Sequence, residues 1–110
     1  MSDVRYHETR DVPAAALNYG IWRAMAGATT AVPEAMKRGA GAFAGLHPDD
    51  QAAVAAFGQR AWSFVYEQAE IGTDPLHEAS ARARIDAELP CLDPWTREVL
   101  WNVAYRQAMM

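Results

Sequence analysis

The sequence predicts an all-α fold, a small bundle of four to five helices in a single domain. Alanine, the best helix former, accounts for 23 of the 110 residues. The β-branched residues that favour strands are few and scattered. The prolines fall at the edges of the alanine-rich stretches, where helices begin and end. A chain of this length forms one modest core, so we expect an N-terminal arm over residues 1–11 and a helical domain over residues 12–110.

The first two helices follow from apolar residues at helical spacing. The first is predicted from about Pro13 to Thr30, with an apolar face of Leu17, Ile21, Ala24, Met25 and Ala28. Gly20 and Gly27 weaken this helix and would let a neighbouring backbone come close. A short second helix over residues 34–45 would make its apolar contacts through Met36, Ala40 and Phe43.

The third and fourth helices begin at a proline that follows a capping side chain. The third is predicted from Pro48 to Ile71, and Gly72 would end it. Its apolar stripe consists of Val54, Phe57, Ala61, Phe64 and Val65, and Trp62 and Tyr66 lie on a flanking face. The fourth is predicted from Pro75 to about Leu89, with an inward seam of Leu76, Ala79, Ala83 and Ala87. Ile85 and Leu89 would then point elsewhere.

The fifth helix, from Pro94 to the end of the sequence, has apolar residues around its whole circumference. They are Trp95, Val99, Leu100, Trp101, Val103, Ala104, Tyr105, Ala108 and Met109. Such a helix either lies at the centre of a fold or contacts another chain. We infer that part of its surface meets a partner, while a central core helix remains the alternative.

Charge and cysteine content exclude several classes of protein. The formal net charge is −4, which gives no electrostatic drive toward nucleic acid or an anionic membrane. Acidic residues gather at the predicted starts of the last three helices, where the helix dipole favours them. The single cysteine, Cys91, excludes an internal disulfide framework. Without an apolar run long enough to cross a bilayer, we expect a cytoplasmic protein that binds no membrane.

No motif indicates a catalytic, cofactor-binding or metal-binding site, and the sequence therefore favours a function without catalysis. The histidines His7, His47 and His77 lack the helical spacing that zinc sites require. Cys91 lies near a helix start that could lower its pKa, but no histidine can be paired with it, so an apolar filler role is favoured. The glycine-rich stretch 39–45 follows no strand and lacks a Gly-Lys-Ser/Thr ending.

The function that the sequence favours is protein–protein interaction, as a homo-oligomer or as an accessory subunit, regulator or inhibitor of a larger partner. Tryptophan, tyrosine, methionine and arginine are enriched at such surfaces. The residues predicted to bind the partner are Trp95, Arg97, Trp101, Tyr105, Arg106, Met109, Trp62 and Tyr66. On this hypothesis Trp101→Glu yields a soluble monomer whose helicity is largely intact.

Two other functions remain open. The four tryptophans and four tyrosines could line a cavity for a hydrophobic small molecule, in a binding protein or an enzyme. The last two helices could also form a helix-turn-helix that presents Arg97, Asn102, Arg106 and Gln107 to DNA. The acidic residues beside that helix would repel phosphates, so nucleic acid is the less favoured partner.

Overall fold

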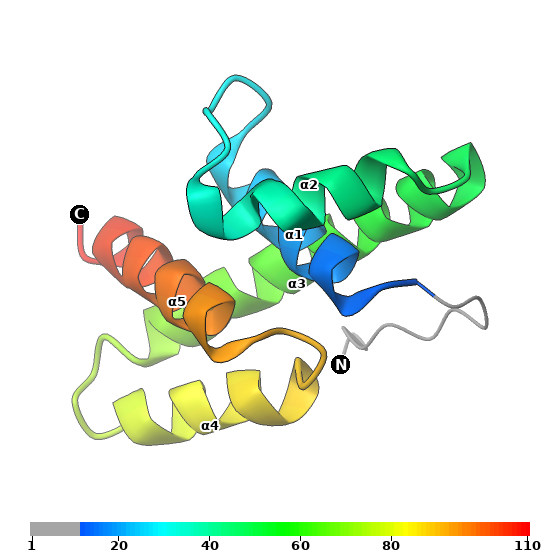
Figure 1. The fold of residues 1–110 in the computed structure, drawn as a ribbon. Helices are drawn as coiled ribbons and strands as arrows, with labels where there is room; N and C mark the ends of the chain where they lie inside the picture. Colours follow the sequence, from blue (N-terminus) through cyan, green and yellow to red (C-terminus); the bar gives the residue numbers. More distant parts are fainter. Residues whose placement is uncertain (1–11) are drawn as a thin grey trace.

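The computed structural model describes residues 12–110, so the predicted arm over residues 1–11 lies outside the described residues. Five helices follow one another: α1 (Ala14–Ala26), α2 (Glu34–Ala44), α3 (Pro48–Ile71), α4 (Glu78–Glu88) and α5 (Pro94–Ala108) (Figure 1). Residues 12–110 contain no strand, which confirms the prediction of a small all-α bundle. Within the same range, no helix combines the length and the apolar character needed to cross a bilayer.

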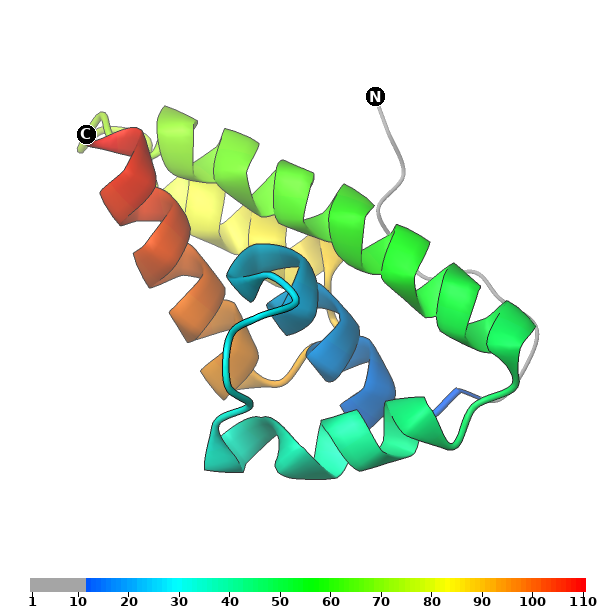
Figure 2. The same cartoon turned by 90° about the horizontal axis from the view of Figure 1, so that it is seen from above.

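The longest helix, α3, is the element against which most of the other helices pack. Helices α1, α4 and α5 all pack against it, and α2 packs against α1 (Figure 2). The predicted stripe of α3 is confirmed at Val54, Phe57, Ala61 and Val65, which are fully buried, whereas Phe64 is only partly buried. The inward faces of α1 and α2 contribute Leu17, Ile21 and Met36 to the interior.

Helix α5 is not the central helix, contrary to one of the two alternatives drawn from its composition. Its buried residues, Thr96, Leu100, Trp101 and Ala104, lie on one side only. The longer helix α3 has more of the packing contacts, since α1, α4 and α5 all pack against it. The opposite side of α5 faces solvent, and Trp95, Glu98, Asn102 and Arg106 are exposed there.

The seam predicted for α4 is wrong. Leu76, Ala79, Ala83 and Ala87 are all exposed, and the helix buries Ala81 and Ile85 instead, followed by Leu89. Isoleucine and leucine remove far more apolar area from water than alanine does, so they decide which side of the helix faces α3. Counting apolar positions without weighing their size selected the wrong face.

Two helix ends differ from the prediction for local reasons. Helix α1 stops at Ala26 rather than Thr30, because Gly27 adopts a φ of +87°, a left-handed conformation that glycine tolerates. Helix α4 starts at Glu78 rather than Pro75, because the side chain of Asp74 accepts a hydrogen bond from the backbone N–H of Leu76 (2.9 Å). This bond holds residues 74–77 in turns before the helix begins.

Candidate functional site

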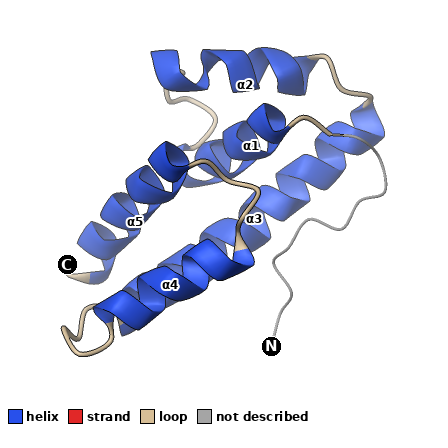
Figure 3. Cartoon of the chain, turned by 60° about the horizontal axis from the view of Figure 1, so that its bottom comes forward, coloured by secondary structure: helices blue, strands red, loops and turns tan. Residues whose placement is uncertain are grey.

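Exposed apolar side chains gather at one end of the molecule. Five large hydrophobic residues are exposed among residues 12–110, and four of them are Ile71, Leu76, Met109 and Met110. Ile71 ends α3, Leu76 lies in the loop between α3 and α4, and the two methionines follow α5. Figures 1 and 3 both place this loop and the C-terminal end of α5 at the same end of the structure. We call these four residues the apolar end.

A contact between α3 and α5 brings this end together. The ring of Trp101 covers Gly72, where an added Cβ would come within 2.6 Å of Cη2 of Trp101. Tyr105 stacks on Trp101 one turn later, with ring centroids 5.9 Å apart. Met109 follows after one further turn, and its backbone N–H donates to the carbonyl of Tyr105 (3.0 Å). The indole of Trp101 therefore fixes where the end of α5 lies relative to the end of α3.

The apolar end is surrounded mainly by carboxylates. Glu67, Glu70 and Asp74 are exposed beside Ile71 and Leu76, and Glu78 opens α4. Arg106 lies in the last turn of α5, and two arginines of α4 are nearby but already engaged, Arg82 with Glu98 and Arg84 with Oε1 of Gln68 (3.3 Å). Exposed hydrophobic residues that occur singly need no explanation, whereas a group of them with a polar rim is typical of an interaction surface.

The structure places three of the predicted partner-binding residues in internal contacts. Trp101 is only 4% exposed, and the guanidinium of Arg82 lies 5.1 Å from its ring centroid. Arg97 donates to the carbonyl oxygens of Leu92 (2.6 Å) and Leu89 (3.3 Å) and lies 3.1 Å from a carboxylate oxygen of Asp86. Tyr105 is partly buried against Trp101. These side chains hold α5 on the bundle and join it to α4.

The other predicted residues divide between two places. Trp95, Arg106 and Met109 are exposed on the outer side of α5, with Trp95 44% exposed. Trp62 and Tyr66 are half-buried on α3, where their rings meet edge to face with centroids 6.3 Å apart. The eight residues therefore do not form one continuous surface, and Met109 is the one that lies at the apolar end.

Sequence reasoning missed Ile71 and Leu76 as surface residues. Ile71 was the last residue of the predicted third helix, and Leu76 was assigned to the inward seam of the fourth. A signal for Leu76 was present, because Asp-Pro before it favours a turn and not only a helix start. No comparable signal marks Ile71, since its exposure depends on how α3 and α5 meet.

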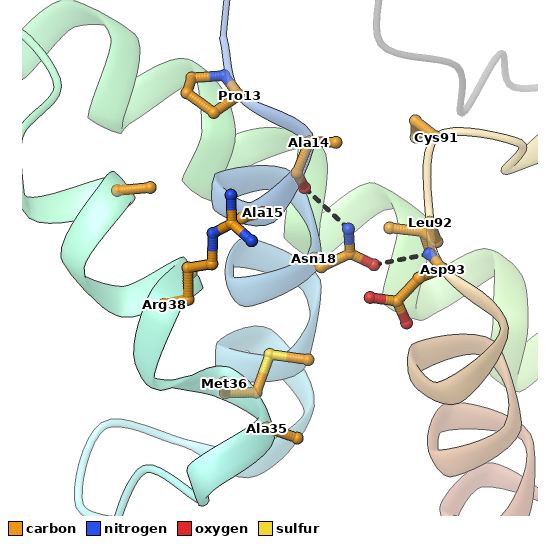
Figure 4. Close-up of a pocket in the computed structure, with 12 residues that line it drawn as sticks. Pro13, Ala14, Ala15, Asn18, Ala35, Met36, Arg38, Cys91, Leu92 and Asp93 are labelled. Atoms are coloured by element: carbon orange, nitrogen blue, oxygen red, sulfur yellow. Dashed lines mark hydrogen bonds between the residues drawn. The ribbon is translucent and has the colours of Figure 1, made fainter.

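A pocket of about 630 Å³ lies at the start of α1, between α2 and the connection from α4 to α5 (Figure 4). Small or apolar residues make up most of its lining: Pro13, Ala14, Ala15, Ala35, Met36, Gly39, Ala42 and Leu92. A second pocket of about 330 Å³ is lined in part by the aromatic residues Tyr19 and Phe43, together with Arg23. The sequence had suggested an aromatic lining, which describes this smaller pocket better than the first.

Four polar side chains enter the lining of the 630 Å³ pocket: Asn18, Arg38, Cys91 and Asp93. Asn18 is buried and joins α1 to the start of α5, because its Oδ1 accepts from the backbone N–H of Asp93 (2.8 Å) and its Nδ2 donates to the carbonyl of Ala14 (2.7 Å). Asp93 caps α5 by accepting from the N–H of Thr96 (2.7 Å). Arg38 forms no ion pair within residues 12–110, and Figure 4 shows its guanidinium beside Ala15.

Cys91 lines the pocket but lacks the setting of a nucleophile. Partial burial raises the pKa of its thiol, because the thiolate loses hydration. A hydrogen bond to its own backbone and the charge of Arg97 oppose this shift without cancelling it. A reactive cysteine requires the opposite shift, so the environment of Cys91 favours the neutral thiol.

Histidines and carboxylates do not gather into a metal site in the described part of the chain, where no group of three or more His, Cys, Asp or Glu could hold an ion. His47 instead caps α3, since its Nδ1 accepts from the N–H of Asp49 (3.1 Å). His77 lies at the start of α4, 3.8 Å from Asp74. His7 lies outside the described residues.

Comparisons with family models, curated proteins and solved structures found no match for this chain.

Proposed function

We propose that this protein acts by binding another protein through the apolar end. The observation that carries the proposal is the clustering of four of the five exposed large hydrophobic residues at one end of the described chain. Burial of such side chains on binding would remove apolar surface from contact with water. This removal is the main favourable term in most protein association. The remaining one, Trp95, stands apart from them on the outer side of α5.

The way these residues are held supports the proposal. Leu76 is 86% exposed, yet the hydrogen bond from its N–H to Asp74 fixes its backbone in a turn. A side chain presented by an ordered turn loses less conformational entropy on binding than one on a flexible segment. Methionines such as Met109 and Met110 adapt to the shape of a partner because their side chains are unbranched and polarizable.

The test compares the apolar end with Trp95 in the same assay. The full chain with an affinity tag retains its partner from a lysate of its native cell, and the retained protein is purified. Its affinity for the chain is then measured by titration calorimetry. We expect the double variant Leu76→Ser/Met109→Ser to weaken binding about tenfold or more, because truncating central interface residues has effects of this size. Trp95→Ser should change the affinity less than about twofold.

The opposite result identifies a different surface. If Trp95→Ser abolishes binding and the double variant does not, the partner contacts the outer side of α5 and the proposal is wrong. A partner that binds both variants normally also contradicts it. The double variant changes only exposed side chains, so its circular dichroism and unfolding midpoint should match those of the unmodified chain.

A second function is favoured by the 630 Å³ pocket. Ligand sites usually have volumes of about 300–1,000 Å³, an apolar lining and a few polar groups that orient the ligand. Met36 and the surrounding alanines supply the apolar lining, and Arg38 supplies a cation without an ion-pair partner in the described residues. We therefore propose, as the second candidate, that the pocket binds an apolar molecule with one acidic group.

The probe for this candidate is anilinonaphthalene sulfonate. Its ring system is apolar, its sulfonate carries one negative charge, and its fluorescence increases when it moves from water into an apolar site. We expect saturable binding of one molecule per chain. Ala42→Phe should block binding by filling the pocket, and Arg38→Gln should weaken it by removing the cation. Lys37→Gln is the control, because it removes the same charge from the neighbouring residue, which does not line the pocket and pairs with Glu34 (2.8 Å). Binding that ignores both pocket variants would contradict the candidate.

A further inference from the structure

We infer that the segment bound at the apolar end is a basic amphipathic segment of another protein. This inference rests on the proposed function and adds the chemistry of the partner to it. The observation behind it is the charge around the apolar end, which is strongly one-sided, while the rest of the described chain is balanced.

The sequence from Arg60 to Arg82 contains four carboxylates and no lysine or arginine between these two residues. The carboxylates are Glu67, Glu70, Asp74 and Glu78, all on the segments that form the apolar end. With Arg106 they give this end a charge of −3, whereas the other described residues carry seven basic and seven acidic side chains. The net negative charge of the described chain therefore lies mainly on the segments that form the apolar end, although Arg84 of α4 reaches Gln68 there (3.3 Å).

These carboxylates remain available for a partner. Within residues 12–110, Glu67, Glu70 and Glu78 take part in no ion pair, and Asp74 lies 3.8 Å from Nε2 of His77, a contact that is ionic only with a protonated imidazole. Glu67, Glu70 and Asp74 are exposed, so their carboxyl groups are in contact with water. An incoming lysine or arginine would not have to displace an ion pair among the described residues in order to meet Glu67, Glu70 and Glu78.

The helix dipoles add to the negative charge at the apolar end. Helices α3 and α5 both end here, and each helix C-terminus has partial negative charge. Helix α3 has no basic residue in its last turn to offset it, while α5 has Arg106. Helix α4 begins here with partial positive charge, and Glu78 in its first turn matches that charge. The sum of side chains and helix ends is negative.

The negative charge around the apolar end determines which kind of partner can bind there. A second copy of the chain would bring its own four carboxylates against these, and facing like charges disfavour an interface. Nucleic acid and anionic membranes carry the same sign and would be repelled. A segment that alternates apolar and basic side chains would bury Ile71, Leu76 and Met109 and place its cations on the carboxylate rim.

The test uses three fluorescein-labelled peptides of equal length and the full chain, with binding measured by fluorescence anisotropy. The first has leucine on one face and lysine on the other, the second has the lysines replaced by glutamate, and the third has the leucines replaced by serine. We expect the first to bind and the other two to bind at least about tenfold more weakly, which corresponds to 1.4 kcal/mol. Raising the salt concentration should weaken the binding of the first peptide, because salt screens exposed charges.

Variants of the chain separate the rim from a general attraction to an acidic protein. Glu67→Gln and Glu70→Gln should each lower the affinity for the leucine–lysine peptide about threefold, as expected for the loss of an exposed ion pair. Glu34→Gln, on exposed α2, is the matched control and should leave the affinity unchanged. Its carboxylate carries one charge like theirs but lies away from the apolar end, where it pairs with Lys37 (2.8 Å).

Each failure has a distinct meaning. If the leucine–lysine peptide does not bind, if the glutamate peptide binds equally well, or if Glu70→Gln acts no more strongly than Glu34→Gln, the partner is not basic and the inference is wrong. The proposed function survives these results when Leu76→Ser/Met109→Ser still weakens the partner purified from the lysate. A dimer of the chain in light scattering that the double variant dissociates would make a second copy the occupant and overturn the inference.

Discussion

The carbonyl oxygen of Gly20 occupies the space in which a side chain of Gly58 would lie. A Cβ atom added to Gly58 would be 2.5 Å from that oxygen, closer than real Cβ contacts. One added to Gly20 would be equally close to Cγ1 of Val54. Helices α1 and α3 therefore touch backbone to backbone at this crossing, and two glycines without side chains make the contact possible.

Gly58→Ala should destabilise the protein by about 1–3 kcal/mol, the usual cost of inserting a methyl group into a packed contact. The backbone of α1 would have to move away, since the obstacle is a carbonyl group and not a flexible side chain. Alanine also raises helix propensity by about 1 kcal/mol, so the measured loss is the difference of two effects. Urea denaturation followed by circular dichroism measures it.

Gly41→Ala is the matched control for this prediction. It lies in α2, where an added Cβ would meet nothing within 4 Å. With propensity as the main effect, it should stabilise the protein by up to about 1 kcal/mol. If Gly58→Ala stabilises the protein as much as Gly41→Ala does, α1 and α3 are not in backbone contact.

Local residues predict both ends of α3 and the start of α5. Both ends of α3 agree with the prediction, because Pro48 fits the first turn of a helix and His47 caps it. Asp93 before Pro94 has the same role at the start of α5. Such signals act within a few residues, so no tertiary contact is needed to interpret them.

The orientation of each helix could not be predicted in this way. The ring of Trp101 is buried because Gly72, at the far end of another helix, leaves room for it. The apolar end depends on the same contact, since Trp101 beside Gly72 sets where α5 ends relative to α3. The pocket likewise needs Asn18 of α1 and Asp93 of the α4–α5 connection, which are 75 residues apart. Periodicity within one helix contains no information about such pairs.

Trp101 carries a second prediction, which reverses the one drawn from the sequence. Because its indole is buried against Gly72, Trp101→Glu should unfold the protein and not merely release a monomer. Trp101→Ala should cost about 3–5 kcal/mol, as for other buried aromatic residues. Trp95→Ala, on the exposed side of α5, should cost well under half of that. Retention of full helicity and a normal unfolding midpoint by Trp101→Glu would contradict the burial of this side chain.

Asn18 carries a third prediction, because it joins α1 to the first turn of α5. Asn18→Ala removes the acceptor of the Asp93 N–H and the donor to Ala14, and it should destabilise the protein by about 1–3 kcal/mol. Asn102→Ala, on the exposed side of α5, is the control and should be close to neutral. Amide hydrogen exchange adds a local measurement, since the Asp93 N–H should exchange faster in Asn18→Ala. Unchanged exchange at Asp93 would show that the Asn18 side chain does not protect it.

Cys91 carries a fourth prediction, which concerns the dependence of stability on pH. Burial raises the pKa of its thiol above the ordinary value of 9.0, so the unfolded chain loses this proton at a lower pH than the folded chain does. The thiol therefore contributes stability that is fully present below pH 9.0 and is lost as the pH rises through the folded pKa. The free energy of unfolding should fall more steeply above pH 9.0 in the unmodified chain than in Cys91→Ala, which isolates the thiol from other groups that titrate there. Alkylation by iodoacetamide should also reach its half-maximal rate at a higher pH for the folded chain than in urea, and equal values would contradict the effect of burial.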